Sequence, residues 1–133
     1  MREIALAAVL AAPVAPAVDY NAAYCLALVA YHEARSEIPL AQLGVIQVAL
    51  NRWANSDGTL CDVVMRPGQF HVPSQPAPDD IHWIEAQVLA ENVMTYAPPD
   101  VTGGALFFSS DDTPPTGAPR HRPLRLGKLR FWR

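Results

Sequence analysis

The segment NAAYCLALVAYHEARSE, residues 21–37, is the stretch from which the fold of this chain is best inferred. Its apolar residues recur at intervals of three and four, which is typical of a helix with a buried face. Asp19 or Asn21 can cap the first turn, and Pro39 lies just beyond the end of the pattern. The sequence therefore predicts a helix over residues 21–35.

Two further helices and a small sheet are expected downstream, over residues 39–53, 79–96, 104–109 and 124–131. Pro39 suits the first turn of the second helix, and Asp79 or Asp80 can cap the third. The residues expected to face inward from these two helices are Leu43, Ile46, Leu50 and Trp53, and Ile81, Ile84, Val88 and Leu89. Helices followed by strands predict a mainly helical α+β domain with a small C-terminal antiparallel sheet.

Length and composition indicate one exported domain. The chain has 133 residues, half of them hydrophobic, and a net charge of −3, which excludes a disordered tail and a multi-span membrane protein. Residues 1–17 predict a signal peptide or an N-terminal anchor, because a charged start precedes an apolar run too short to span a bilayer. A packed N-terminal helix is the alternative. Residues 18–133 are expected to form the folded domain.

The two cysteines, Cys25 and Cys61, are expected to form a disulfide. An even number of cysteines in an exported chain favours such a pairing, and two reduced, buried cysteines are the alternative. Two cysteines cannot complete a structural zinc site alone, and the histidines lack the spacing for one. No metal or cofactor is therefore expected.

Basic residues are concentrated at the C-terminal end. Six of the ten lie in the last fourteen residues: Arg120, Arg122, Arg125, Lys128, Arg130 and Arg133. A basic end on an acidic body could hold an anionic polymer, and a solvated hairpin with outward-pointing arginines is the alternative. Nucleic acid is not expected as a partner, because the rest of the chain is acidic and carries no evident aromatic and basic platform.

The candidate chemistry lies where the first helix ends. Glu33 follows a long apolar run, so its carboxyl is expected to be partly withdrawn from water, as a general acid requires. The pattern that begins at His32 is not that of a zinc protease, because Ser36 stands where a second histidine is needed. The alternative is a surface ion pair between Glu33 and Arg35 or Arg52.

Ordered motifs run through most of the chain: CLALVAYHEARSE (25–37), QLGVIQVALNR (42–52), CDVV (61–64), PGQF (67–70), GALFF (104–108) and LGKLRFWR (126–133). Together these segments resemble the SleB/CwlJ-type cell-wall hydrolases, a family that includes spore-cortex-lytic enzymes. The resemblance implies a lysozyme-related catalytic domain that cleaves peptidoglycan glycan strands, with Glu33 as the catalytic acid.

Family members of the spore type act as lytic transglycosylases, so the resemblance implies cleavage between MurNAc and GlcNAc by that reaction. The alternatives are a hydrolytic muramidase that uses a second carboxylate, and a catalytically silent peptidoglycan-binding or virion component. The expected location is the periplasm or the cell wall, reached by export or by delivery of a phage-encoded enzyme. The chain is expected to act as a monomer.

Five more residues are expected to contact the substrate or to support the acid: Glu37, Arg52, Gln69, Phe70 and Phe108. The amide of Gln69 can hold an N-acetyl group, and the ring of Phe70 can contact an apolar sugar face. Phe108 is expected to line the groove from a strand. Glu37 is a candidate second carboxylate, although orienting the next helix is the commoner role for an acid there. Arg52 is expected to pair with a carboxylate or to cap the second helix.

Overall fold

The computed structural model describes residues 18–119 and 121–133, so the predicted leader, residues 1–17, lies outside the described part of the chain. In chain order the elements are α2 (Tyr20–Ala34), α3 (Pro39–Ala54), α4 (Leu60–Met65), α5 (Ile81–Tyr96), β1 (Phe107–Ser109), β2 (Leu124–Leu126) and β3 (Leu129–Trp132). Helices precede a small antiparallel sheet, which confirms the predicted mainly helical α+β class.

Helix α2 forms the centre of the hydrophobic core. Ten of its fifteen residues are buried, and the side chains of Leu26 and Val29 have no exposed surface. The Asp19 carboxylate caps the helix by accepting hydrogen bonds of 3.1 Å from the backbone N–H groups of Asn21 and Ala22. Because α2 packs against α3, α4 and α5, it is a rigid support for the residues at its C-terminal end.

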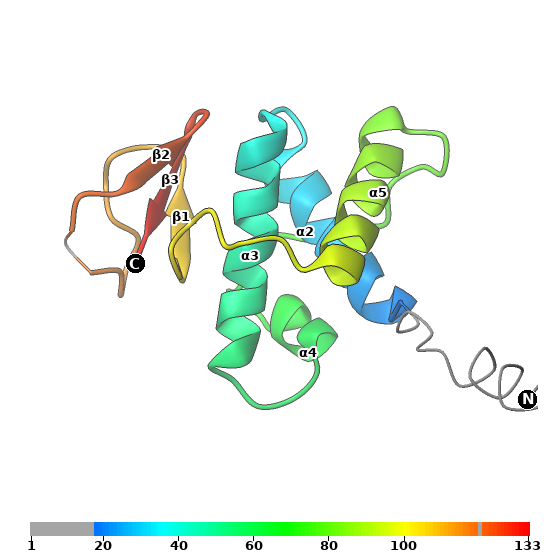
Figure 1. Ribbon diagram of the computed structural model, residues 1–133, viewed down its shortest axis with the longest axis horizontal. Helices are drawn as coiled ribbons and strands as arrows, with labels where there is room; N and C mark the ends of the chain where they lie inside the picture. Colours follow the sequence, from blue (N-terminus) through cyan, green and yellow to red (C-terminus); the bar gives the residue numbers. More distant parts are fainter. Residues whose placement is uncertain (1–17, 120) are drawn as a thin grey trace, which may run out of the picture.

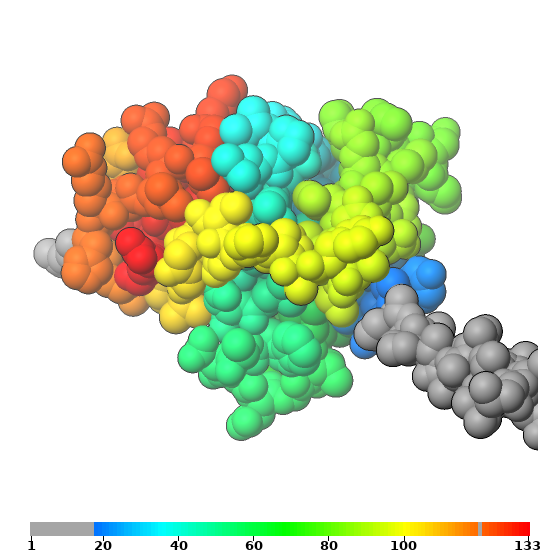
Figure 2. All heavy atoms as spheres, viewed as in Figure 1, coloured from blue at the N-terminus to red at the C-terminus, as the bar shows by residue number. Residues whose placement is uncertain are grey.

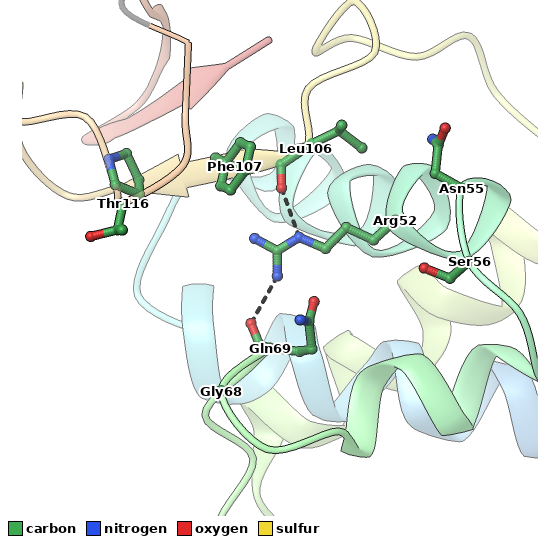
Figure 3. Close-up of a pocket in the computed structure, with 9 residues that line it drawn as sticks. Arg52, Asn55, Ser56, Gly68, Gln69, Leu106, Phe107 and Thr116 are labelled. Atoms are coloured by element: carbon green, nitrogen blue, oxygen red, sulfur yellow. Dashed lines mark hydrogen bonds between the residues drawn. The ribbon is translucent and has the colours of Figure 1, made fainter.

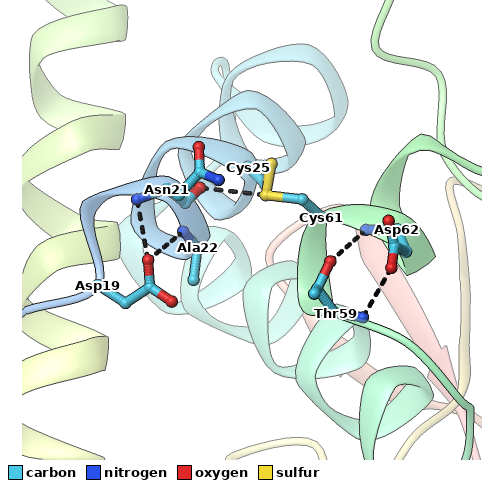
Figure 4. The surroundings of a disulfide bond; sticks show 7 residues. All are labelled: Asp19, Asn21, Ala22, Cys25, Thr59, Cys61 and Asp62. Atoms are coloured by element: carbon cyan, nitrogen blue, oxygen red, sulfur yellow. Dashed lines mark hydrogen bonds between the residues drawn. A yellow bond between two sulfur atoms is a disulfide. The ribbon is translucent and has the colours of Figure 1, made fainter.

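A disulfide ties α2 to α4, a helix that the sequence analysis did not predict. Cys25 is bonded to Cys61 with the two Cα atoms 5.5 Å apart, which confirms the expected pairing (Figure 4). Helix α4 begins with a capping box, in which Thr59 and Asp62 each accept a hydrogen bond from the backbone N–H of the other. The spacing of Thr59 and Asp62 is the sequence signal that identifies this six-residue helix.

The buried face of α5 differs from the predicted one. Three residues expected to face inward are exposed: Ile81, Ile84 and Val88. The helix instead packs on α2 through alanines and Trp83, whose ring meets those of Tyr24 and Tyr31 edge to face. A large aromatic side chain gains more from burial than the aliphatic residues do, so Trp83 determines which face turns inward.

Helix α3 packs against the sheet through a glycine. A Cβ atom at Gly44 would lie 2.7 Å from Cζ of Phe131, so the close approach of α3 and β3 requires glycine here. Ile46 is buried as predicted, but Trp53 is 41% exposed. Trp53 lies in the last turn of α3, where its indole N–H donates to the carbonyl oxygen of Gly58.

The sheet has the strand order β1-β3-β2, and both pairs are antiparallel. β1 is shorter than the predicted strand over residues 104–109, because Gly103 and Gly104 have positive φ and turn the chain just before it. The segment 124–131 forms a hairpin, with Gly127 at φ +59 between β2 and β3. Phe108 of β1 lies opposite Phe131 of β3.

Helix α3 lies between the sheet on one side and α2 with α5 on the other (Figure 1). The segment that follows α5, residues 97–106, crosses α3 to reach β1, and its atoms form a continuous band on this face of the molecule (Figure 2). Within residues 18–119 and 121–133, no helix has the length and apolar character needed to cross a bilayer.

Candidate active site

Glu33 lies in the last turn of α2, one residue before the helix ends. Its side chain is half-buried, and Oε1 accepts a hydrogen bond of 2.8 Å from the backbone N–H of His71. This bond engages one carboxylate oxygen as an acceptor, which leaves Oε2 as the position where a proton can be held. The rigid core helix and the loop after α4 together fix the carboxyl group.

A cavity of about 410 Å³ lies beside Glu33 and brings together five of the six predicted site residues. Its lining consists of Glu33, Arg52, Gly68, Gln69, Phe70, His71 and Phe108. The rings of Phe70 and Phe108 are stacked with centroids 6.4 Å apart, and the Gln69 side chain is exposed. An apolar wall with a few polar groups and one acid is typical of a ligand-binding site.

Arg52, from the last turn of α3, joins the loop that carries Gln69 to the segment that carries Leu106, as the close-up of the neighbouring pocket shows (Figure 3). Its Nε–H donates to the carbonyl oxygen of Leu106 at 2.7 Å, and its Nη1–H donates to that of Gln69 at 2.8 Å. The guanidinium also lies over the ring of Phe70, 4.6 Å from its centroid. Burial lowers the pKa of Arg52, and the nearby carboxylate of Glu33 opposes that shift. Two N–H donors of Arg52 are thus bonded to backbone groups of the cavity walls.

Two amide side chains, one turn apart on α3, hold the segment that leads to β1. Gln47 donates to the carbonyl oxygen of Pro99 and accepts from the N–H of Val101, both at 2.8 Å. Asn51 donates to the carboxylate of Asp100 at 2.9 Å. These bonds fix the band of residues that crosses α3, and with it the start of β1.

Asp100 organises the turn before β1. Its carboxylate accepts hydrogen bonds from the N–H and hydroxyl of Thr102 and from the N–H of Gly104, in addition to the bond from Asn51. Partial burial of the carboxylate acts to raise the pKa of Asp100, but the hydrogen bonds from Thr102, Asn51 and Gly104 outweigh it and lower the pKa below its ordinary value. The charged form of Asp100 is therefore part of the folded structure.

The loop over residues 71–80 is fastened to α2. His32 Nε2–H donates to the carbonyl oxygen of Ser74 at 2.6 Å. The hydroxyl of Tyr31 donates to the Asp80 carboxylate, which also caps α5. This hydrogen bond raises the pKa of Tyr31 and lowers that of Asp80. These two bonds anchor the loop on the C-terminal side of His71, whose backbone N–H donates to Glu33.

Glu37, a predicted site residue, lies outside the cavity. Its Oε2 accepts a hydrogen bond of 3.2 Å from the backbone N–H of Lys128, in the turn between β2 and β3. A Cβ atom at Gly127 would come within 2.8 Å of the same oxygen. Glu37 therefore joins the start of α3 to the sheet. Among the described residues that line the cavity, Glu33 alone carries a carboxylate.

Sequence reasoning missed three residues that shape the site: Gln47, His71 and Asp100. Two amides at an i, i+4 spacing, Gln47 and Asn51, in an otherwise apolar helix are a signal that could have revealed the first. An aspartate followed by Val-Thr-Gly-Gly is typical of a side-chain-supported turn, which could have revealed Asp100. His71 contributes through its backbone N–H, and residue type gives no indication of that contact.

Fold and site together define a mainly helical enzyme domain in which one carboxylic acid lies in a cavity between a core helix and a small sheet. The profile of the cell wall hydrolase family matches residues 36–132, and the chain belongs to this family. The crystal structure of the catalytic domain of the Bacillus cereus SleB protein is similar, with a TM-score of 0.62 and 26% sequence identity. That similarity covers 90% of this chain and 95% of the other. No curated protein matches the sequence significantly.

The protein is therefore a cell-wall lytic enzyme of the glycosidase type with a lysozyme-like fold, as the motifs implied. A disulfide in such an enzyme indicates an extracytoplasmic location. The match to the family profile begins at Ser36 and therefore does not include Glu33. The structural similarity covers 90% of the chain, so it extends to residues that precede Ser36.

Proposed function

We propose that this enzyme is a lytic transglycosylase that cleaves peptidoglycan between MurNAc and GlcNAc, with Glu33 as its one catalytic carboxyl group. The observation that carries the proposal is the position of the two candidate acids. Glu33 lines the cavity, whereas Glu37 is bonded to the β2–β3 turn. Glycosidases that use water normally need a pair of carboxylates across the scissile bond, and a transglycosylase does not.

In the proposed reaction Glu33 acts first as an acid and then as a base. Its proton passes to the glycosidic oxygen, and the bond between that oxygen and C1 of the muramyl residue breaks. The resulting carboxylate then takes the proton of the muramyl C6 hydroxyl while O6 bonds to C1, which closes a 1,6-anhydro ring and restores the protonated acid. The hydrogen bond from the His71 N–H to Oε1 supports this assignment, because it orients the carboxyl group in both protonation states.

The remaining cavity residues take supporting roles in this proposal. The exposed Gln69 amide is suited to the N-acetyl group of a sugar, and the stacked rings of Phe70 and Phe108 are suited to an apolar sugar face. Arg52 maintains the distance between these walls. We further propose that residues 1–17 direct export or anchor the enzyme, and that residues 18–133 form the catalytic domain, acting as a monomer in the periplasm or cell wall.

The products of digestion test the proposal. The enzyme is incubated with purified sacculi, and the soluble fragments are separated and identified by mass spectrometry. We expect muropeptides that end in 1,6-anhydro-MurNAc. Fragments heavier by one water, with reducing ends, would contradict the transglycosylase reaction and identify a muramidase. A failure to release any fragment would contradict the enzymatic role and favour a peptidoglycan-binding component.

A further inference from the structure

Several cations at the C-terminal end of the chain have no acidic partner. Four exposed side chains belong to this group: Arg122, Arg125, Lys128 and Arg133. Within residues 18–119 and 121–133, none of the four forms a salt bridge, whereas their neighbour Arg130 is bonded to the Asp112 carboxylate at 2.8 Å. No aspartate or glutamate follows Asp112 in the sequence. The reaction proposed for Glu33 uses none of these four cations.

The register of the sheet brings two of these arginines together. Leu124 of β2 lies opposite Phe131 of β3, so the same antiparallel register, extended by two residues, places Arg122 beside Arg133. Both line a cavity of about 650 Å³, whose other lining residues are His121, Pro123, Leu124 and Phe131. The cavity therefore combines two guanidinium groups and an imidazole with an apolar surface.

The position of Arg133 depends on the segment that crosses α3. A Cβ atom at Gly103 would lie 3.1 Å from Nη1 of Arg133, so the guanidinium lies close against the backbone of that turn. Gly103 has a φ of +63, a conformation that glycine adopts without strain. The turn before β1 thus supports one of the two arginines of the cavity.

This cavity is separate from the one at Glu33. The strand order β1-β3-β2 puts β1 and β2 at opposite edges of the sheet. Phe108 of β1 lines the cavity at Glu33, whereas Leu124 of β2 lines the cavity between the arginines, and the two linings share no residue. Figure 1 shows the C-terminus on the side of the sheet that is away from α2 and α5. A ligand held there would leave the cavity at Glu33 open.

Two neighbouring guanidinium groups favour a phosphate over a carboxylate. One arginine satisfies a carboxylate with two parallel N–H···O bonds, because both groups are planar. A phosphodiester is tetrahedral, and its two non-bridging oxygens can accept hydrogen bonds from two different arginines. The imidazole of His121 can donate a further hydrogen bond from the same cavity. The donor set therefore matches a phosphodiester group.

The other two cations continue this site along the β2–β3 hairpin. Arg125 follows Arg122 by three residues, about 10 Å along an extended chain, and Lys128 lies in the turn between the strands. Because β2 is an edge strand, no further strand of the sheet covers this row. Cations spaced along an open edge match a linear polymer with repeated charges.

We propose that the C-terminal end binds the phosphodiester backbone of an anionic polymer of the cell wall. Arg122 and Arg133 hold one phosphate group, and Arg125 and Lys128 contact the polymer further along the hairpin. Residues 1–119 carry all thirteen acids and four of the ten basic residues, so the rest of the chain repels the same polymer and only this end approaches it. The inference goes beyond the cleavage reaction and does not depend on it.

Binding of soluble poly(glycerol phosphate) at low ionic strength tests the inference by calorimetry. The test variant is Arg122→Gln with Arg133→Gln, and the matched control is Arg35→Gln with Arg66→Gln, which removes the same charge from two exposed positions outside the hairpin. Poly(glutamate) presents the same sign of charge on carboxylates, and phosphatidylglycerol vesicles present phosphate on a membrane. Cleavage of sacculi freed of phosphate polymers is measured in parallel.

We expect the test variant to bind poly(glycerol phosphate) about tenfold more weakly than the unmodified enzyme, and the control to bind it normally. Poly(glutamate) should bind less tightly than the phosphate polymer, the vesicles should not retain the enzyme, and the test variant should cleave sacculi at the normal rate.

Equal weakening in both double variants, or equal affinity for poly(glutamate), would overturn phosphate recognition by this end. Retention on vesicles without binding of the polymer would assign the cations to a membrane surface and overturn the inference too. Slower cleavage by the test variant would place the arginines in the catalytic site, which also contradicts it. A failure of the unmodified enzyme to release anhydro fragments would contradict the proposed reaction alone.

Discussion

The two sides of α3 are stabilised in different ways. On the side of α2 and α5, contact is apolar and close, residues such as Leu26 and Val29 have no exposed surface, and a disulfide joins α2 to α4. On the other side, Gly44 packs closely on the buried Phe131 of the sheet, and hydrogen bonds from Gln47, Asn51 and Arg52 to neighbouring segments also hold the walls of the cavity. The comparison indicates that the helices supply most of the stability, whereas single polar contacts set the shape of the cavity.

Glu33 and the walls around it should therefore respond differently to substitutions. Glu33 is presented by the well-packed helix α2, so its position should survive changes in the cavity walls. The walls depend on a few bonds that each contribute about 1 kcal/mol, so single substitutions there should alter substrate binding before they unfold the protein.

Replacing both Cys25 and Cys61 by alanine should have the largest effect on stability. The disulfide closes a loop of 36 residues, and its loss should lower the free energy of unfolding by about 3–4 kcal/mol, since the unfolded chain regains freedom. Denaturant unfolding under oxidising and reducing conditions measures this. The double variant should still cleave sacculi at temperatures where it is folded. A loss below about 1 kcal/mol would contradict the account of the helical side.

The substitution Gly44→Ala should separate α3 from the sheet. The new Cβ would meet Phe131 at 2.7 Å, and overpacking of this kind costs about 1–3 kcal/mol, partly offset by about 1 kcal/mol from the better helix propensity of alanine. Combining Gly44→Ala with Phe131→Leu should relieve the collision, so the two substitutions together should cost less than the sum of the singles. Additive effects in this double-mutant cycle would show that the contact does not limit the approach of α3 and β3.

Asp100→Asn should have the smallest effect on stability, about 1 kcal/mol at neutral pH, because an amide N–H2 would face the donors of Asn51 and Gly104. Since folding lowers the pKa of Asp100, its charged form stabilises the protein above the ordinary value of 3.8, and this contribution is lost as the pH falls below it. The stability difference between the two proteins should therefore shrink between pH 5 and pH 3. A difference that does not change with pH would contradict the role of the charged carboxylate.

The sequence was sufficient for the elements with strong local signals. The helices that begin near Asp19, Pro39 and Asp80 were predicted to within two residues, because capping residues and helical periodicity act locally. The inward face of α5 was predicted wrongly, since the tertiary contact of Trp83 with two tyrosines decides it and leaves Ile84 exposed. Helix α4 was missed, although its capping box is visible in the sequence.

Candidate site residues could be predicted from the sequence where the type of side chain indicates its chemical role. Glu33, Gln69 and the aromatic residues of the cavity were named from their motifs, and the structure brings them together. The bonding partners of Arg52 and Glu37 were not predictable, because both side chains bond to backbone groups of segments distant in sequence. Long-range contacts of side chains with backbone N–H and carbonyl groups leave no pattern in the sequence, and the same holds for the bond from His71.

The most direct test of the central claim compares the Glu33→Gln and Glu37→Gln variants in cleavage of purified sacculi. Both substitutions keep the size of the side chain and an oxygen that can accept the observed backbone hydrogen bond, so thermal unfolding should confirm that both variants are folded. If Glu33 is the one catalytic acid, its variant should lose activity by about 10²–10⁴-fold, the usual contribution of general acid–base catalysis, while Glu37→Gln should keep most of it. Retained activity in Glu33→Gln, or an equal loss in Glu37→Gln, would contradict the account.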